Sequence, residues 1–185
     1  ACADVRRWTQ LPAGRDCLVA INLSARQFAE DNLLETVVAA LERHGLNAMQ
    51  IELEITECLV MLRPEKASRL LQQVRALGCH VALDDFGTGY SSLAYLRRFP
   101  LDQLKIDKSL IQDVAIVRAV IQLASSFGLK TVAEGVEDDP TLELLRYMGC
   151  DIVQGYYYSR PLPIDAFLAF MAARNMPGSQ LQLVN

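Results

Sequence analysis

Acidic residues recur in this sequence at the ends of short apolar runs. Asp84 and Asp85 follow the run "HVAL", while Glu54 and Glu134 hold similar positions in "IELEIT" and "TVAEGVE". Oxygen ligands without histidine favour Mg²⁺ or Mn²⁺ over Zn²⁺. Adjacent carboxylates can hold two such ions close together, an arrangement that activates a water and clamps a phosphodiester. These residues therefore point first to metal-dependent phosphoryl chemistry.

Polar residues stand near the ends of six strand-like runs, 20 to 32 residues apart: Asn22, Glu54, Asp84, Lys105, Glu134 and Gln154. Lys105 is the cation of this set, and it could orient or deprotonate a water or stabilise negative charge on a phosphate. For any one acid taken alone, an ion pair or a helix cap is the commoner role, and Asp84 with Asp85 could form a capped turn. Six such residues at matching positions are better explained by one shared site.

Alternation along two of these runs sorts the side chains by face. Glu52 and Glu54 share one face of "IELEIT", and Lys105 and Asp107 share one face of "QLKIDK". This polar face would point into the protein interior, where unpaired charge is costly, and divalent cations would resolve the excess of acid. Glu52 and Asp107 lie deeper on that face, and we interpret them as structural partners of Lys105 or of other internal charges.

The elements that must position these residues alternate along the chain. Strands are expected at 17–24, 50–57, 80–87, 102–108, 130–137 and 151–159. Helices are expected at 31–45, 67–78, 115–128, 141–149 and 163–174. This alternation predicts βαβ units and a parallel sheet. An open doubly wound sheet would place its ligand at one switch point, whereas a (β/α)8 barrel gathers every strand end around a single mouth. We therefore predict a TIM-like (β/α)8 barrel.

The length suggests that part of this barrel is absent. A complete barrel typically has about 250 residues, and the 185 residues show six strand–helix units. Residues 1–8 already have a helical pattern, so we expect the N-terminal strand or strands to lie upstream. The prediction is one domain, 1–185, that is incomplete at its N-terminus.

Composition is that of an ordinary globular protein, with 51% hydrophobic and 22% charged residues. The net charge of −4 gives no global positive field, so we expect no binding to DNA. Five widely spaced cysteines without a C-x-x-C fit reduced thiols. No apolar run reaches the length of a membrane span and no signal-peptide pattern begins the chain. A cytoplasmic location is the expectation, with any membrane anchor carried by other domains.

Six segments stand in this order between residues 21 and 163: "INLSARQF", "IELEITE", "LDDFGTGYSSLAYL", "LKIDKSLI", "TVAEGVE" and "GCDIVQGYYYSRPLP". Together they resemble the EAL-domain family of cyclic di-GMP phosphodiesterases. The resemblance implies a TIM-like barrel that hydrolyses cyclic di-GMP to linear pGpG with two Mg²⁺ or Mn²⁺ ions. It also implies a homodimer and attached sensory or GGDEF domains.

The resemblance assigns roles by position. Asn22, Glu54 and Asp84 match ligands of the first metal, while Asp84 and Asp85 match the second site, with Asp84 bridging. Lys105 matches the lysine that holds the attacking water. The other matched positions are Glu134 and Gln154 in the mouth, Glu137 just outside the ligands, Glu57 securing the loop after Asp85, and Arg160 near the substrate; Asp107 joins them as an internal charge.

The sequence departs from the family pattern in two places, and these departures leave more than one function open. The Glu-Ala-Leu signature and the arginine that follows it are absent from this chain, and their place in the family is on an upstream strand. The family also has several more residues between Asp113 and Ala115. Either the loop is deleted here or residues are missing at the 113–115 junction, and we favour the second. An active phosphodiesterase is the leading hypothesis. The alternatives are a non-catalytic cyclic di-GMP receptor and, less favoured, a scaffold that binds no dinucleotide.

Overall fold

One parallel sheet organises the chain. The computed structural model describes residues 2–9, 17–87, 93–174 and 183–184. Within these ranges the strand order is β6-β5-β4-β3-β2-β1-β7, and every neighbouring pair is parallel. The strands are β1 Val19–Asn22, β2 Ile51–Thr56, β3 His80–Phe86, β4 Gln103–Ile106, β5 Lys130–Ala133, β6 Ile152–Val153 and β7 Leu183–Val184.

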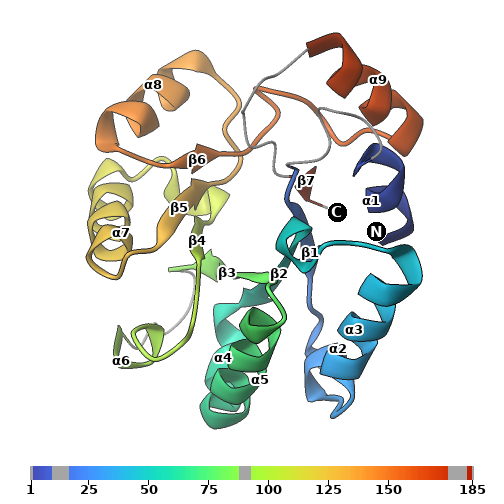
Figure 1. Ribbon diagram of the computed structural model, residues 1–185. Coiled ribbons are helices and arrows are strands. Elements are labelled where there is room, and N and C mark those ends of the chain that lie inside the picture. The colour runs from blue at the N-terminus through green and yellow to red at the C-terminus, as the bar shows by residue number, and fades with distance from the viewer. Residues whose placement is uncertain (1, 10–16, 88–92, 175–182, 185) are drawn as a thin grey trace.

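Helices surround the outside of this sheet (Figure 1). The α-helices are α1 Cys2–Thr9, α2 Ala25–Ala29, α3 Leu33–His44, α4 Glu57–Leu62, α5 Pro64–Ala76, α6 Leu93–Leu96, α7 Val114–Ser126, α8 Asp139–Met148 and α9 Ile164–Arg174. Two 3-10 helices, η2 Ala48–Gln50 and η3 Lys108–Leu110, follow α3 and β4. The sheet curls into an incomplete barrel, which confirms the predicted TIM-like architecture. Among the described residues, no helix is long and apolar enough to cross a bilayer.

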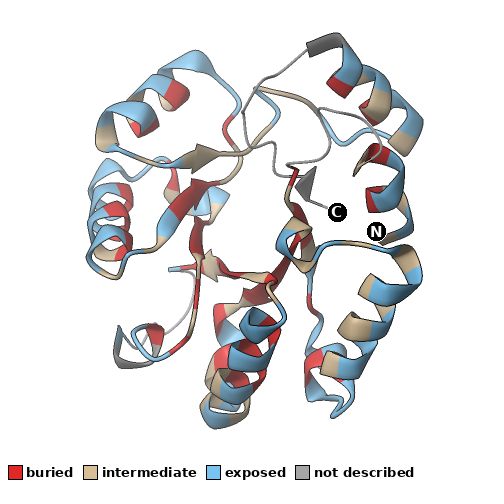
Figure 2. Cartoon of the chain, in the orientation of Figure 1, coloured by how far each residue is buried: buried red, intermediate tan, exposed pale blue. Residues whose placement is uncertain are grey.

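The core lies between the strands and the inner faces of the helices (Figure 2). In β2, Ile51, Leu53 and Ile55 are buried, and so are Glu52 and Glu54 on the opposite face. A strand buried on both sides is what a barrel requires, because one face meets the helices and the other faces the interior. The polar face predicted from alternation therefore does point into the barrel.

The six predicted strands are all present, but each ends before its predicted boundary, and two of them illustrate why. The run 50–57 stops at Thr56, and Glu57 begins α4 instead of ending the strand. The run 151–159 yields only β6, because the chain turns after Gln154 and the Tyr157 amide donates to the Val136 carbonyl. The sequence analysis did not anticipate β7, which pairs with the outer edge of β1.

The chain passes through residues 113–115 directly into the first turn of α7. The Asp113 carboxylate accepts hydrogen bonds from the amides of Ala115 and Ile116, at 3.0 and 3.1 Å, and so caps α7. That residues are missing from the sequence at this junction remains a prediction.

Candidate functional site

The centre of the site is a buried lysine held among three carboxylates. Lys105 on β4 is 1% exposed. Its Nζ lies 2.6 Å from Oε1 of Glu54, 2.8 Å from Oε1 of Glu134 and 3.1 Å from Oδ1 of Asp84. The acids come from β2, β3 and the residue after β5, so neighbouring parallel strands bring them together. These four residues are the ones expected to meet from their positions at the strand ends.

Burial and neighbouring charges have opposite effects on the pKa values of Lys105, Glu54 and Glu134. Burial opposes the charged form of Lys105, but its carboxylate neighbours outweigh burial and raise its pKa above the ordinary value. Burial raises the pKa of Glu54 and of Glu134, and the positive charge of Lys105 only partly offsets that rise. Three acids facing one lysine leave an excess of negative charge in a poorly solvated space.

Asp85 belongs to the same centre. Carboxylate oxygens of Asp84, Asp85 and Glu134 lie within 4.8 Å of one another. Asp85 has a left-handed backbone with φ 55°, which aspartate tolerates better than most residues, and its amide donates to Oδ1 of Asp84 at 3.0 Å. Burial and the charge of Asp84 raise the Asp85 pKa. This unusual backbone turns two successive acids toward one point.

Several buried side-chain oxygens at the strand ends accept no hydrogen bond among the described residues. They include Oε2 of Glu54, Oε1 of Glu57 and Oε1 of Gln154. Buried acceptors are normally satisfied, so an unpaired carboxylate oxygen beside other acids indicates room for a cation. The donor set is composed of oxygen atoms alone, which matches Mg²⁺ or Mn²⁺. The residues present therefore fit the divalent cations that the sequence predicted.

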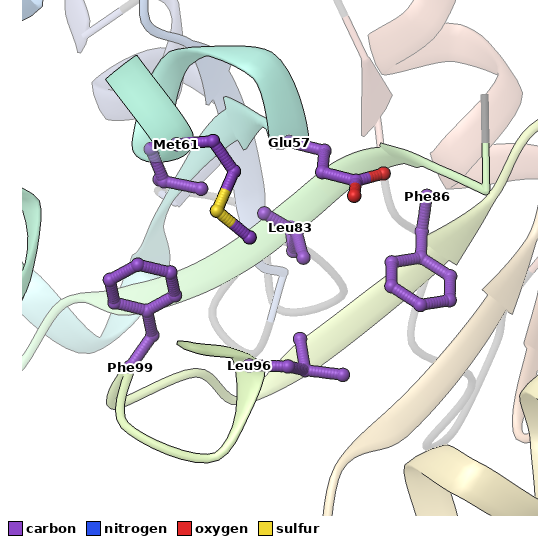
Figure 3. Close-up of a pocket in the computed structure, with 7 residues that line it drawn as sticks. Glu57, Met61, Leu83, Phe86, Leu96 and Phe99 are labelled. Atoms are coloured by element: carbon purple, nitrogen blue, oxygen red, sulfur yellow. The ribbon is translucent and has the colours of Figure 1, made fainter. Parts of the chain in front are cut away.

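Asn22 and Glu57 lie beside this centre. Asn22, at the end of β1, is the register partner of Glu54, so its side chain stands at the same level of the barrel. Glu57 is buried at the start of α4, and its Oε2 accepts the Gly87 amide at 3.4 Å. Its carboxylate stands at one end of a small apolar hollow that includes Met61 and Phe86 (Figure 3). The predicted glycine-bearing loop after Gly87 falls at 88–92, outside the described residues.

Two other predicted residues, Asp107 and Glu137, lie at the margin. Asp107 pairs with neither Lys105 nor another internal lysine, contrary to our interpretation; its carboxylate accepts the Ser109 amide at 2.9 Å and caps η3. The charge of Asp107 also raises the pKa of Asp85, although burial and the charge of Asp84 raise it more. Glu137 forms an ion pair with Lys108.

Arg160 lies over the ring of a tyrosine that was not among the predicted site residues. Its Cζ is 4.8 Å from the centroid of Tyr156, and the Tyr156 side chain is about half exposed. Nothing in the run of three tyrosines in "GYYYS" separates the first tyrosine from the other two. Lys108 was missed for a similar reason, because a lysine after "KID" carries no distinctive pattern.

Comparisons with known proteins agree with this geometry. The family model described as the EAL domain matches residues 1–161. The chain belongs to the EAL domain family. The cyclic di-GMP phosphodiesterase NbdA of Pseudomonas aeruginosa is 44% identical over 180 residues, which cover 94% of this chain and 23% of NbdA. The chain thus spans about a quarter of that relative.

Solved EAL structures share the fold. The c-di-GMP complex of the PaMucR phosphodiesterase has a TM-score of 0.87 and 41% identity, with coverage of 90% of this chain and 70% of that one. The manganese and cy-diGMP complex of Klebsiella pneumoniae BlrP1 has a TM-score of 0.75 and 33% identity, with coverage of 85% and 42%.

Proposed function

We propose that this EAL domain is a metal-dependent phosphodiesterase that hydrolyses cyclic di-GMP to linear pGpG. The observation that carries the proposal is the buried Lys105 among Glu54, Asp84 and Glu134, with Asp85 beside them. A receptor that only bound the dinucleotide would not require so much buried acid, which is costly without a cation. Relatives described as cyclic di-GMP phosphodiesterases support the same substrate.

The acids divide into two proposed metal sites. Asn22, Glu54 and Asp84 would hold one ion, and Asp84 with Asp85 would hold the other, with Glu134 close to both. When bound, two divalent cations would activate a water and stabilise negative charge on the phosphodiester. Mg²⁺ and Mn²⁺ both fit these oxygen ligands, and the Mn²⁺ complex of BlrP1 supports Mn²⁺.

The chain's own groups would prepare the reaction. A lysine ammonium has three donors and no acceptor, so Lys105 is suited to orient the water and to neutralise charge on the phosphate. Glu134 is 2.8 Å from Lys105 Nζ and is placed to accept a proton from that water. The unpaired amide oxygen of Gln154 provides a further acceptor in the mouth.

Residues at the margin would bind or secure the substrate side. Arg160 and Tyr156 form an exposed cation–π pair that could receive a phosphate and a guanine face. Asp107 and Glu137 contribute negative charge outside the ligands, and Glu57 holds the chain at Gly87 where the loop after Asp85 begins. We also propose that the domain acts as a homodimer, in the cytoplasm, joined to sensory or GGDEF domains.

The test is product analysis with the intact protein. Cyclic di-GMP is incubated with Mn²⁺ or Mg²⁺, with EDTA as the metal-free control, and products are separated by chromatography. The proposal predicts pGpG with either metal and none with EDTA. A folded sample that binds cyclic di-GMP in calorimetry but yields no product would establish the receptor instead. A sample that neither binds nor hydrolyses it would favour a scaffold.

A further inference from the structure

A half-exposed ion pair spans two loops beside the metal-binding acids. Lys108 begins η3, just after β4, and Glu137 lies in the turn that follows β5. The Nζ of Lys108 contacts Oε1 of Glu137, and the two side chains are 63% and 49% exposed. This pair joins the loop that follows Lys105 to the turn that begins with Glu134.

The aliphatic part of Lys108 also fixes this turn. Gly135 has φ 68°, and a Cβ atom built on it would lie 2.5 to 2.7 Å from the Cβ, Cγ and Cδ atoms of Lys108. The lysine stem therefore occupies space that is open only because residue 135 has no side chain. Charge and packing both connect Lys108 to the same four-residue turn, 134–137.

Backbone hydrogen bonds hold the other sides of the turn. The Glu134 amide donates to the Ile106 carbonyl at 3.1 Å, and the Val136 amide donates to the Gln154 carbonyl at 3.0 Å. These bonds fix alternate residues of the turn. Lys108 contacts the remaining two, Gly135 through its stem and Glu137 through its charge. The direction of the Glu134 carboxylate thus depends on a turn that Lys108 completes.

The geometry points to Lys108 as a positioning residue that holds the 134–137 turn and thereby aims Glu134 at Lys105, Asp84 and Asp85. This inference rests on the proposed function, and it adds a residue to which we assigned no contact with metal or substrate. An exposed ion pair contributes little to global stability. Loss of a group that orients a metal ligand, by contrast, commonly costs about 10- to 100-fold in metal affinity or activity.

The variants separate the charge of Lys108 from its stem. Lys108→Met keeps an unbranched stem without charge, Lys108→Ala removes both, and Lys108→Arg keeps both. The matched control is Arg146→Ala, which removes another half-exposed pair, Arg146 with Glu143 at 2.6 Å on α8. All variants are made in the intact protein, and their melting temperatures are compared before any other measurement.

Two readouts test the inference. Mn²⁺ binding is measured by calorimetry without substrate, and steady-state hydrolysis of cyclic di-GMP gives kcat and KM. Lys108→Ala should weaken Mn²⁺ binding and lower kcat by about 10-fold or more, with KM and melting temperature nearly unchanged. Lys108→Met should show a smaller loss, while Lys108→Arg and Arg146→Ala should resemble the wild type.

Other outcomes would overturn the inference. Lys108→Ala with wild-type Mn²⁺ affinity and kcat would show that the turn keeps its position without the lysine. A rise in KM with unchanged kcat would make Lys108 a substrate contact instead. If the wild type binds Mn²⁺ but does not hydrolyse cyclic di-GMP, the proposed function fails while the Mn²⁺ measurement still decides the role of Lys108. A wild type that binds no Mn²⁺ would contradict both.

Discussion

Nζ of Lys105 lies 2.6 Å from Oε1 of Glu54, and both side chains are almost completely buried. Replacing Lys105 by methionine would leave Glu54 and its neighbouring acids without a compensating charge. Removing one partner of a buried ion pair typically costs about 3–5 kcal/mol. We expect the free energy of unfolding of Lys105→Met to fall by about that amount in metal-free buffer, as measured by urea denaturation.

The matched control for this prediction is Lys66→Met. Lys66 also forms an ion pair, 2.9 Å from Asp31, but the Asp31 side chain is almost fully exposed. An exposed pair contributes little, so the denaturation midpoint of this variant should stay near that of the wild type. Equal losses of unfolding free energy in Lys105→Met and Lys66→Met would show that burial of the Lys105 ion pairs does not increase their contribution to stability.

The packing between α5 and the sheet gives a second prediction. Leu71 is 0% exposed, whereas Leu62 on α4 is 75% exposed. Leu71→Ala should lower the free energy of unfolding by about 2–5 kcal/mol, because it leaves a cavity in a packed core. Leu62→Ala should change it by less than about 0.5 kcal/mol. Urea denaturation of both variants tests the placement of these helices, and a loss at Leu62 as large as that at Leu71 would refute it.

A close backbone approach behind the site gives a third prediction. A Cβ atom on Gly155 would lie 2.0 Å from the Val136 carbonyl oxygen and 2.4 Å from its nitrogen. Gly155→Ala must therefore displace the turn after β6. In that turn the Gln154 carbonyl accepts the Val136 amide, and the Tyr157 amide donates to the Val136 carbonyl. We expect a loss of about 1–3 kcal/mol in stability and at least about a tenfold loss in cyclic di-GMP hydrolysis.

Gly128→Ala is the control for that substitution. Gly128 has φ 70°, and a Cβ atom there would meet nothing within 4 Å. The change should cost about 1 kcal/mol of left-handed strain and leave hydrolysis unchanged. Full activity of Gly155→Ala would mean that the turn after β6 does not position the site.

The cysteines give a prediction that depends on pH. Burial raises the pKa of the Cys79 and Cys150 thiols, whereas Cys58 is exposed. A raised pKa lowers the thiolate fraction at any pH below it, so both buried thiols should react with iodoacetamide more slowly than Cys58 at pH 8. Their rates should keep rising as the pH increases further. Peptide mass spectrometry over time measures this, and equally fast labelling of all three in the folded protein would contradict it.

The grouping of residues at the centre of the candidate site could be predicted from the sequence. The periodicity of the strands and the positions of the polar residues at their ends are enough to place them together. In a parallel barrel the strand ends meet at one mouth, so Glu54, Asp84, Lys105 and Glu134 had to lie close together once their strands were recognised. The 20-to-32-residue spacing carried that information without any knowledge of side-chain contacts.

The margin could not be predicted in the same way. Asp107 follows β4 directly, and alternation placed it among the internal charges, but a local hydrogen bond to Ser109 makes it a helix cap instead. The contact of Lys108 with Gly135 joins loops that are distant in sequence, whereas Arg160 stacks on Tyr156 within one loop. Loop-to-loop contacts of this kind have no period, so only the folded chain reveals them.

Hydrolysis in water enriched in ¹⁸O tests the central claim most directly. The intact protein is incubated with cyclic di-GMP and Mn²⁺ in this water, and the product is analysed by mass spectrometry. If the site directs a water at phosphorus, pGpG should form with one ¹⁸O atom in its terminal phosphate, and Asp84→Asn should abolish it. Unchanged cyclic di-GMP with folded wild-type protein, or pGpG without the label, would contradict the account.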